Sequence, residues 1–303
     1  MTRQAEGHLA MLLFAALVGG SFSLGALAAN EISPLAFNAL RFWIAAVILG
    51  LAVIGRGVPR HALAAPWRYV VLGTLYAVYF WLMFEGLRTA APVSAAAVFT
   101  LTPLMAAVFG LVLLGQSFTP RLVTALAVGA AGALWVIFDA DLAALLAFDI
   151  GRGEAIFLIG CVAHALYAPM VRLLNRGEPA PVFTLGVLVV GAVALSALGW
   201  DDIRSTDWTA LPRSVWVALL YTAVFTTAVT FVLMQVAALR LPSAKVMAYT
   251  YLVPGSVILW EIGLGGVLPS PLVLVGVGLT AAALVLLVRD EDGGSVIPAP
   301  RSR

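Results

Sequence analysis

The chain is short of charge and of cysteine, and each shortage excludes a class of protein. Charged residues make up 11% of its 303 residues, whereas hydrophobic residues make up 62%. A soluble domain carries about 25% charged residues, so this chain has too few to cover a surface that faces water. The single cysteine, Cys161, can form neither an intrachain disulfide nor a thiolate metal site. A net charge of +2 from scattered arginines offers no basic surface for nucleic acid.

Long apolar runs take the place of the missing charges. They span about 20 residues each, the length that an α-helix needs to cross the hydrocarbon of a bilayer. Strands of a membrane barrel would alternate apolar and polar residues over roughly 10 positions, and the runs do not. Because lipid offers the backbone no hydrogen-bond partner, the runs must be helical. The sequence therefore predicts an all-α integral membrane protein with ten transmembrane helices. We place them at residues 8–29, 34–55, 66–87, 93–115, 119–138, 153–173, 180–199, 212–238, 243–265 and 270–288.

Positive residues between the predicted spans are unevenly distributed. Of the 17 Lys and Arg residues, twelve fall on the side of the N-terminus, four fall on the opposite side, and Arg41 lies within a span. Lys and Arg gather in the cytoplasmic loops of membrane proteins. We therefore expect both termini to be cytoplasmic, in a bacterial inner membrane.

The two halves of the chain repeat at an offset of 151 residues. The aligned blocks are Phe80-Trp81-Leu82-Met83 with Phe231-Val232-Leu233-Met234, Leu101-Thr102-Pro103 with Leu252-Val253-Pro254, Gly115 with Gly266, and Pro120 with Pro271. Each half, 8–138 and 153–288, holds five predicted spans. Because five is odd, the second half must enter the membrane in the opposite sense to the first. Many secondary transporters have such inverted repeats and open one central site alternately to the two sides.

Short motifs along both halves are similar to those of one family. They are Gly20-Ser21-Phe22, Pro34, Arg41-Phe42, Ala90 to Pro103, Leu114-Gly115, Gly129, Gly132, His164-Ala165-Leu166-Tyr167, Pro254 and Leu264-Gly265. With ten predicted spans in two halves, the chain resembles the drug/metabolite transporter superfamily, and in particular its EamA-type members, over about residues 8–288. EamA-type halves usually end their fourth span with Leu-Gly-Glu, whereas this chain has Gln116 and Val267 at the acidic positions. The resemblance implies two EamA-like repeats and the transport of small metabolites.

The third predicted span carries an aromatic face. Tyr76, Tyr79, Phe80 and Met83 are spaced at i, i+3, i+4 and i+7, which places them on one side of a helix. Such a stripe can simply pack against other helices, but a tyrosine hydroxyl inside a bilayer needs a partner or a water-filled space. We expect these four residues to bind substrate, together with Phe99 of the fourth span.

Proline stands near the middle of the fourth and ninth predicted spans, at repeat-related positions. Pro103 cannot bond to the carbonyl of Phe99, and Pro254 leaves the carbonyl of Thr250 without its helical partner. Irregular backbone at that depth is tolerated where it lines a cavity or is shielded by protein. A packing kink is the alternative. We expect Pro103 and Pro254 to be hinges, and Thr250 and Tyr251 to lie in the substrate site.

Two ionisable residues lie well inside predicted spans. His164 is close to the midplane, about 11 residues into the sixth span at a rise of about 1.5 Å per residue, and Tyr167 shares its face. His164 can stack on substrate, carry a proton, or only hydrogen-bond a neighbouring helix. Arg41 lies about two turns into the second span, where it can snorkel to water or bond to carbonyls of the next helix. The resemblance supports a structural role for it.

The residues expected in the site are mostly aromatic, include a methionine and carry little charge. They predict a central apolar pocket for a small ligand with an aromatic or aliphatic body. The resemblance is strongest to YddG-type members of the superfamily, and it implies export of aromatic amino acids. Efflux of cationic amphiphilic drugs is an alternative, because the same rings could bind a cation.

Two other classes fit less well. An intramembrane enzyme that acts on lipids needs acids and bases that converge, and His8, His61 and His164 are far apart in sequence. A scaffold has no need of inverted halves. We expect a transporter without enzyme activity, cofactor or metal, which works as a monomer in the lipid bilayer on a small-molecule substrate.

Overall fold

A computed structural model describes residues 3–54, 57–117, 119–147 and 150–288 of the chain. Within these ranges the chain forms helices and no strands. Ten helical segments of this part are long and apolar enough to cross a membrane. The predicted all-α architecture with ten transmembrane helices is therefore confirmed, and the chain is a multi-pass membrane protein.

Seven of the spans are single helices and three are interrupted. The single helices are α1 (Arg3–Ala29), α2 (Pro34–Ile54), α4 (Trp67–Gly86), α7 (Pro120–Ile137), α9 (Arg152–Leu174), α10 (Ala180–Leu198) and α16 (Pro271–Val288). The fourth span consists of α5 (Pro92–Phe99) and α6 (Thr102–Leu114). The eighth consists of α12 (Arg213–Ala223), the π-helix η1 (Val224–Val229) and α13 (Thr230–Ala238). The ninth consists of α14 (Ser243–Ala248), the 3₁₀-helix η2 (Tyr249–Leu252) and α15 (Val253–Gly263). Short helices that the sequence did not predict lie between spans: α3 (Arg60–Leu63), α8 (Leu142–Ala147) and α11 (Trp200–Ser205).

The fourth and ninth spans are interrupted where the prolines stand. Pro103 and Pro254 lie in the first turns of α6 and α15, where a helix does not need the N–H that proline lacks. We expected two free carbonyls here, and both are satisfied locally. The carbonyl of Phe99 accepts a hydrogen bond from the Thr102 hydroxyl at 2.7 Å, and that of Thr250 accepts from the backbone N–H three residues later. The prolines therefore start new helical segments without exposing acceptors.

Contacts between spans follow a two-fold pattern. The third span packs on the sixth, and its repeat counterpart, the eighth, packs on the first. The fourth span also packs on the sixth, and the ninth on the first, while the second pairs with the seventh and the fifth with the tenth. Phe80 and its repeat counterpart Phe231 stack on each other with ring centroids 5.6 Å apart. Repeat-related residues touch in this way when they lie beside an approximate two-fold axis.

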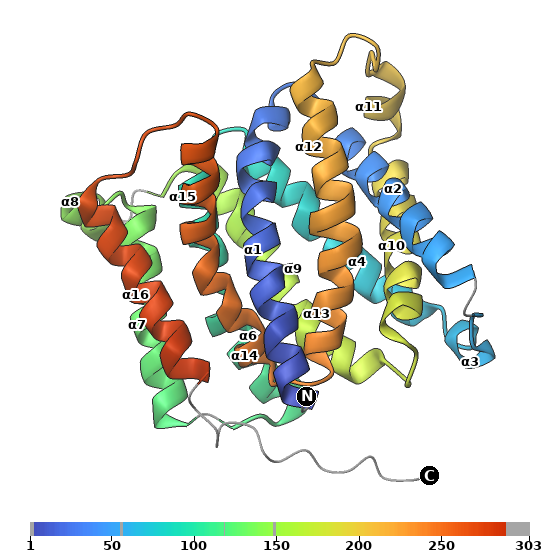
Figure 1. Cartoon of the computed structure of the whole chain (residues 1–303), viewed down its shortest axis with the longest axis horizontal. Coiled ribbons are helices and arrows are strands. Elements are labelled where there is room, and N and C mark those ends of the chain that lie inside the picture. Colours follow the sequence, from blue (N-terminus) through green and yellow to red (C-terminus); the bar gives the residue numbers. More distant parts are fainter. Residues whose placement is uncertain (1–2, 55–56, 118, 148–149, 289–303) are drawn as a thin grey trace.

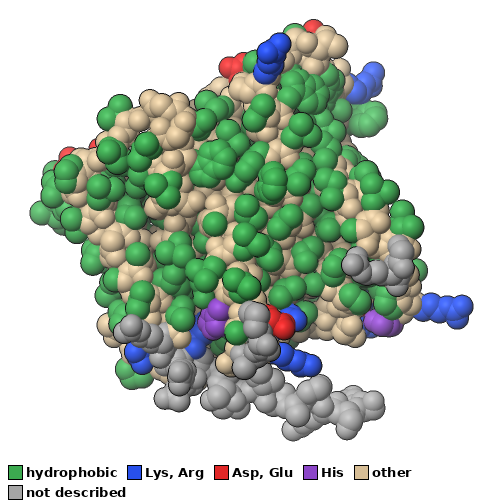
Figure 2. Space-filling view, viewed as in Figure 1, with side chains coloured by type: hydrophobic (Ala, Val, Ile, Leu, Met, Phe, Trp, Pro, Cys, Tyr) green, Lys and Arg blue, Asp and Glu red, His purple; other side chains and the backbone are tan. Residues whose placement is uncertain are grey.

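The molecule has two polar ends and an apolar middle (Figure 2). In Figure 1 the N-terminus, α3 and the junction of α13 with α14 lie at one end, and α11 lies at the other with the start of α12. Between the ends, large apolar side chains stand on outward faces, for example Leu51 at 67% exposed and Leu259 at 72%. Such a continuous apolar surface is unfavourable in water and belongs in lipid.

The fifth and tenth spans, α7 and α16, approach closely at glycines. A Cβ added to Gly276 would lie 2.8 Å from the carbonyl oxygen of Gly132 and 2.8 Å from a methyl carbon of Val136. A Cβ added to Gly278, on the same helix, would meet no atom within 4 Å. Because lipid tails are as apolar as leucine, helices in a membrane associate through such close packing of small residues.

A buried ion pair holds the start of α4 against the turn between α9 and α10. Arg68 Nη2 donates to Glu178 Oε1 at 2.6 Å, and the two side chains are 1% and 0% exposed. Arg68 Nη1 also donates to the carbonyl of Leu174 at 2.6 Å, and the N–H of Arg176 donates to Glu178 Oε2 at 2.6 Å. Burial acts to raise the pKa of Glu178, but the hydrogen bonds from Arg68 and Arg176 outweigh it and lower the pKa below its ordinary value.

We expect Gly276→Val to lower the unfolding free energy of the purified protein by about 1–3 kcal/mol, the usual cost of overpacking. The valine side chain would meet the backbone of Gly132, which cannot move aside cheaply. Gly278→Val is the matched control and should leave thermal unfolding in detergent unchanged. Equal losses in the two variants would contradict a close contact between α7 and α16.

Glu178→Ala should destabilise the protein by about 3–5 kcal/mol, because it leaves the buried Arg68 guanidinium unpaired. Glu85→Ala is the control: it removes an exposed partner of Arg88, 3.2 Å away, and should cost less than about 1 kcal/mol.

The same pair makes stability depend on pH. Because the folded-state pKa of Glu178 is lowered, the contribution of the ionised Glu178 to the free energy of unfolding is complete above the pKa of an unfolded glutamate. It is lost as pH falls through the folded-state pKa. The difference in unfolding temperature between wild type and Glu178→Ala should therefore shrink toward acid pH, and a difference independent of pH would be inconsistent with the ion pair.

Candidate functional site

A small central cavity lies where α1, α4, α9 and the eighth span meet. It is lined by Phe14, Val18, Ser21, Tyr76, Tyr79, Phe80, Met83, His164, Thr226, Thr230 and Phe231. The cavity encloses about 290 Å³ between atoms, but the centre of a water molecule can occupy only about 10 Å³ of it. Such a space holds at most one water. In this conformation the cavity is closed and too small for a metabolite.

Aromatic rings form one wall of the cavity. The four residues expected on one face of the third span, Tyr76, Tyr79, Phe80 and Met83, all line it. His164 of α9 joins them, with its ring centroid 4.4 Å from that of Tyr79. The structure thus brings together five of the residues that sequence reasoning placed in a substrate site.

Two further expected residues stand one layer behind this wall. Phe99 meets His164 edge to face, with ring centroids 4.9 Å apart. Tyr167 stacks on Tyr76 with ring centroids 3.8 Å apart and an angle of 17° between the rings. Both support the wall without lining the cavity.

Thr250 and Tyr251, which we expected in the site, do not line the cavity. The hydroxyls of Thr250 and Thr102 lie 3.3 Å apart, and this contact joins the ninth span to the fourth. Tyr251 packs its ring against Gly129 of α7, and its carbonyl accepts from the hydroxyl of Thr280 at 3.0 Å. Both residues lie in the 3₁₀ turn of η2, where 3.0 residues per turn give side chains other directions than in an α-helix.

The eighth span contributes threonines as well as a ring to the lining. These residues are Thr226 of η1, and Thr230 and Phe231 of α13. At the repeat offset of 151 residues, Thr227 and Thr230 stand where the first half has Tyr76 and Tyr79. The two related spans therefore differ in chemistry at these positions, since the third has tyrosines and the eighth has threonines.

Two polar atoms at the cavity have no hydrogen-bond partner among the described residues. They are Nδ1 of His164 and the hydroxyl of Ser21, both in side chains that are at most 2% exposed. A buried polar atom without a partner costs about 1–3 kcal/mol. Because both residues line the cavity, these atoms are candidates to bond a ligand there. No three His, Cys, Asp or Glu side chains in the described ranges could hold a metal ion, so the site offers rings and hydrogen bonds.

Arg41 of α2 lies behind Phe80 and Thr226 and does not snorkel to water. Its side chain is fully buried. Nε donates to the hydroxyl of Thr227 at 2.6 Å, and Nη2 donates to the carbonyl and hydroxyl oxygens of Thr226 at 3.0 and 2.9 Å. Both threonines belong to the π-helix η1, a rare form that often occurs at functional sites. The sequence predicted either snorkelling or bonds to carbonyls of the next helix; the observed partners are two hydroxyls and one carbonyl of the eighth span.

Sequence reasoning missed the residues that α1 and the eighth span bring to the cavity. They are Phe14, Val18, Ser21, Thr226, Thr230 and Phe231. Two signals were present: Phe231 is the repeat counterpart of Phe80, and Ser21 lies in a motif of the first span. The threonines lay in an apolar run without a helical stripe to single them out.

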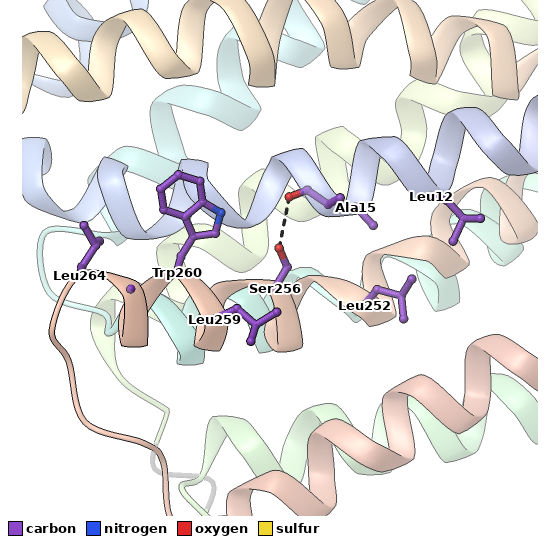
Figure 3. A pocket seen from close by; sticks show the side chains of 9 residues that line it. Leu12, Ala15, Leu252, Ser256, Leu259, Trp260 and Leu264 are labelled. Carbon is purple, nitrogen blue, oxygen red and sulfur yellow. Dashed lines mark hydrogen bonds between the residues drawn. The ribbon is translucent and has the colours of Figure 1, made fainter.

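A larger groove lies between α1 and α15 (Figure 3). The centre of a water molecule can occupy about 590 Å³ of it. It is lined by Leu12, Ala15, Ala16, Leu252, Ser256, Leu259, Trp260, Gly263 and Leu264. The hydroxyl of Ser256 already donates to the carbonyl of Ala16 at 3.3 Å, and Leu259 is among the most exposed apolar side chains. Such a groove suits lipid chains better than a polar metabolite. The central cavity is therefore the better candidate site, although it is smaller.

Comparison with known families gives the class of the protein. The sequence model of the EamA-like transporter family matches the chain twice, over residues 5–138 and 151–289. The chain belongs to the EamA-like transporter family. It is a membrane transporter, and each match covers one half with five of the spans.

Relatives of this EamA-like chain cover nearly its whole length. It is 26% identical over 288 residues to the uncharacterized transporter YyaM of Bacillus subtilis (strain 168), an alignment that covers 92% of this chain and 94% of YyaM. A solved crystal structure superposes with a TM-score of 0.69 at 22% identity and covers 94% of this chain and 95% of the other. At that identity the likeness concerns the fold.

His164→Phe should raise the thermal stability of this EamA-like protein in detergent and lower its transport activity in proteoliposomes. The change removes an unpartnered polar atom, whose burial costs about 1–3 kcal/mol, and keeps a ring in the wall. Thr184→Val is the matched control, because the hydroxyl of Thr184 is also buried without a partner in the described part but lies outside the cavity. It should raise stability and leave transport unchanged. A loss of stability confined to His164→Phe would show that the imidazole is already satisfied.

Proposed function

We propose that this protein exports aromatic or other apolar amino acids across the bacterial inner membrane, with the central cavity as its substrate site. The observation that carries the proposal is a wall of rings beside two unpartnered polar atoms, His164 Nδ1 and Ser21 Oγ. A mostly apolar pocket with a few placed polar groups suits a ligand that has an apolar body and a polar end. An aromatic amino acid has both.

Alternating access supplies the movement that such export requires. Five spans in each half give the halves opposite directions in the membrane, an architecture that opens one site to either side in turn. Phe80 and Phe231 stack across the meeting point of the two halves, so the halves can rock about them. Pro103 and Pro254, at repeat-related helix starts, are the proposed hinges. The closed cavity corresponds to an occluded state between the inward-open and outward-open forms.

The orientation in the membrane follows from charge. Lys and Arg residues gather in the loops on the side of the N-terminus, and this bias is typical of the cytoplasmic side. We therefore place both termini in the cytoplasm, and we propose that a single chain forms the complete pathway.

Efflux of cationic amphiphiles is the second candidate, because aromatic rings attract cations. The lining of the cavity includes no carboxylate to neutralise such a ligand. The guanidinium of Arg41 lies 4.0 Å from the ring centroid of Phe80, directly behind the lining. This positive charge, directly behind the lining, would repel a cationic ligand bound in the cavity. These features favour a zwitterion over a cationic drug.

An intramembrane enzyme has less support. Of the three histidines, only His164 lines the cavity. His8 lies 2.7 Å from the hydroxyl of Tyr249 near the start of α1, and His61 lies in α3 outside the spans. The three imidazoles therefore do not converge on one site.

Counterflow in proteoliposomes should show saturable exchange of L-phenylalanine and L-tyrosine. Tyr79→Ala should lower the exchange about tenfold, because it removes a ring contact worth about 0.5–1.5 kcal/mol beyond its buried area. Phe225→Ala is the matched control: Phe225 is 44% exposed and does not line the cavity, so exchange should match wild type. Exchange of a lipophilic cation without exchange of any amino acid would support drug efflux and overturn the proposal.

A further inference from the structure

Arg41 carries a buried positive charge that no acid of the described residues neutralises. The ion pairs in this part of the chain, such as Arg68 with Glu178, do not include it. Its side chain is 0% exposed inside a membrane-spanning bundle. Taking a lone cation out of water costs several kcal/mol, and ionisable residues within spans are by default candidates for function.

The partners of Arg41 are neutral and leave donor capacity unused. A guanidinium has five N–H donors. Nε and Nη2 bond to oxygen atoms of Thr227 and Thr226 at 2.6 to 3.0 Å. Nη1 has one long contact, 3.5 Å to the amide oxygen of Asn38. The hydrogen bonds spread the charge without cancelling it, and Nη1 has a donor to spare.

Only one layer of side chains separates this charge from the cavity. The layer consists of Phe80, whose ring centroid is 4.0 Å from the guanidinium carbon, and Thr226, whose hydroxyl accepts from Nη2 at 2.9 Å. Both residues line the cavity. A negative group placed against this layer would lie within reach of the guanidinium field, and a small movement of the Phe80 ring would bring it into contact.

The charge stands on one side of an asymmetric site. The seventh span, residues 180–198, is the repeat counterpart of the second and contains no charged residue. Tyr79 and His164 lie in one part of the lining, and Phe80 and Thr226, which are both backed by Arg41, lie in another. A ligand with a ring at one end and a carboxylate at the other matches this polarity.

We propose that Arg41 determines specificity by selecting substrates that carry a carboxylate. The carboxylate lies against Thr226 and Phe80, with Arg41 behind them, and the ring of the substrate lies against Tyr79 and His164. The substrate then neutralises the buried cation. A ligand without a carboxylate does not, and the free-energy cost of burying the unpaired Arg41 guanidinium remains. This inference rests on the proposed function, in which the cavity is the transport site.

Two half-substrates of L-phenylalanine separate its polar groups. 3-Phenylpropionate keeps the carboxylate and lacks the amine, whereas phenethylamine keeps the amine and lacks the carboxylate. Each is offered, at pH 7, as a competitor of L-phenylalanine counterflow by the wild-type protein in proteoliposomes. We expect 3-phenylpropionate to inhibit at a concentration about 10- to 100-fold below that of phenethylamine, the range for one charge-assisted contact.

Three variants then assign the preference to the guanidinium. Arg41→Gln should remove the difference between the two competitors, and Arg41→Lys should retain most of it because the charge remains. Arg88→Gln, which removes an exposed positive charge, is the control and should keep the wild-type difference. Size-exclusion profiles show which variants fold. If Arg41→Gln does not fold, the proposal is judged on the two competitors in the wild type and in Arg41→Lys. The wild type must prefer 3-phenylpropionate, and Arg41→Lys must retain most of that preference.

The outcomes separate this inference from the function on which it rests. Equal inhibition by the two half-substrates in wild type, or an unchanged difference in folded Arg41→Gln, overturns the role of Arg41 and leaves amino acid transport standing. If the proteoliposomes show no counterflow of L-phenylalanine at all, the proposed function itself is overturned.

Discussion

The absence of water from the hydrocarbon core governs this molecule, because every buried polar group must find its partner within the protein. Most do: the carbonyls beside Pro103 and Pro254 accept local hydrogen bonds, and Arg68 pairs with Glu178. The exceptions in the described part therefore carry information. Two of them, His164 Nδ1 and Ser21 Oγ, belong to residues that line the same small cavity, and a third group, Arg41, keeps its charge one layer behind it.

The repeat explains why the cavity lies where it does. Helices that pack in a two-fold pattern meet at an axis, and residues beside the axis are contributed by both halves. Phe80 and Phe231 have kept the same side chain there, whereas the neighbouring tyrosines of one half are threonines in the other. A nearly symmetric fold therefore has an asymmetric cavity lining. Under the proposed function, this asymmetry lets a substrate with two unlike ends bind in one direction.

The fold could be predicted from the sequence because each span is defined by a local property, an apolar run of sufficient length. The aromatic face of the third span could be predicted for the same reason, since helical periodicity places Tyr76, Tyr79, Phe80 and Met83 together. The π-helix η1 and the 3₁₀ turn at Tyr251 could not, because they depend on packing between distant segments. Arg41 shows the limit most clearly: its acceptors, Thr226 and Thr227, lie 185 and 186 positions away along the chain.

The most direct test of the central cavity as the substrate site is a crystal structure of the protein with 4-bromo-L-phenylalanine, measured at the bromine absorption edge. The account predicts one anomalous peak beside Tyr79 and His164, with the carboxylate of the ligand toward Thr226. A peak in the groove between α1 and α15, beside Leu259 and Trp260, would contradict it.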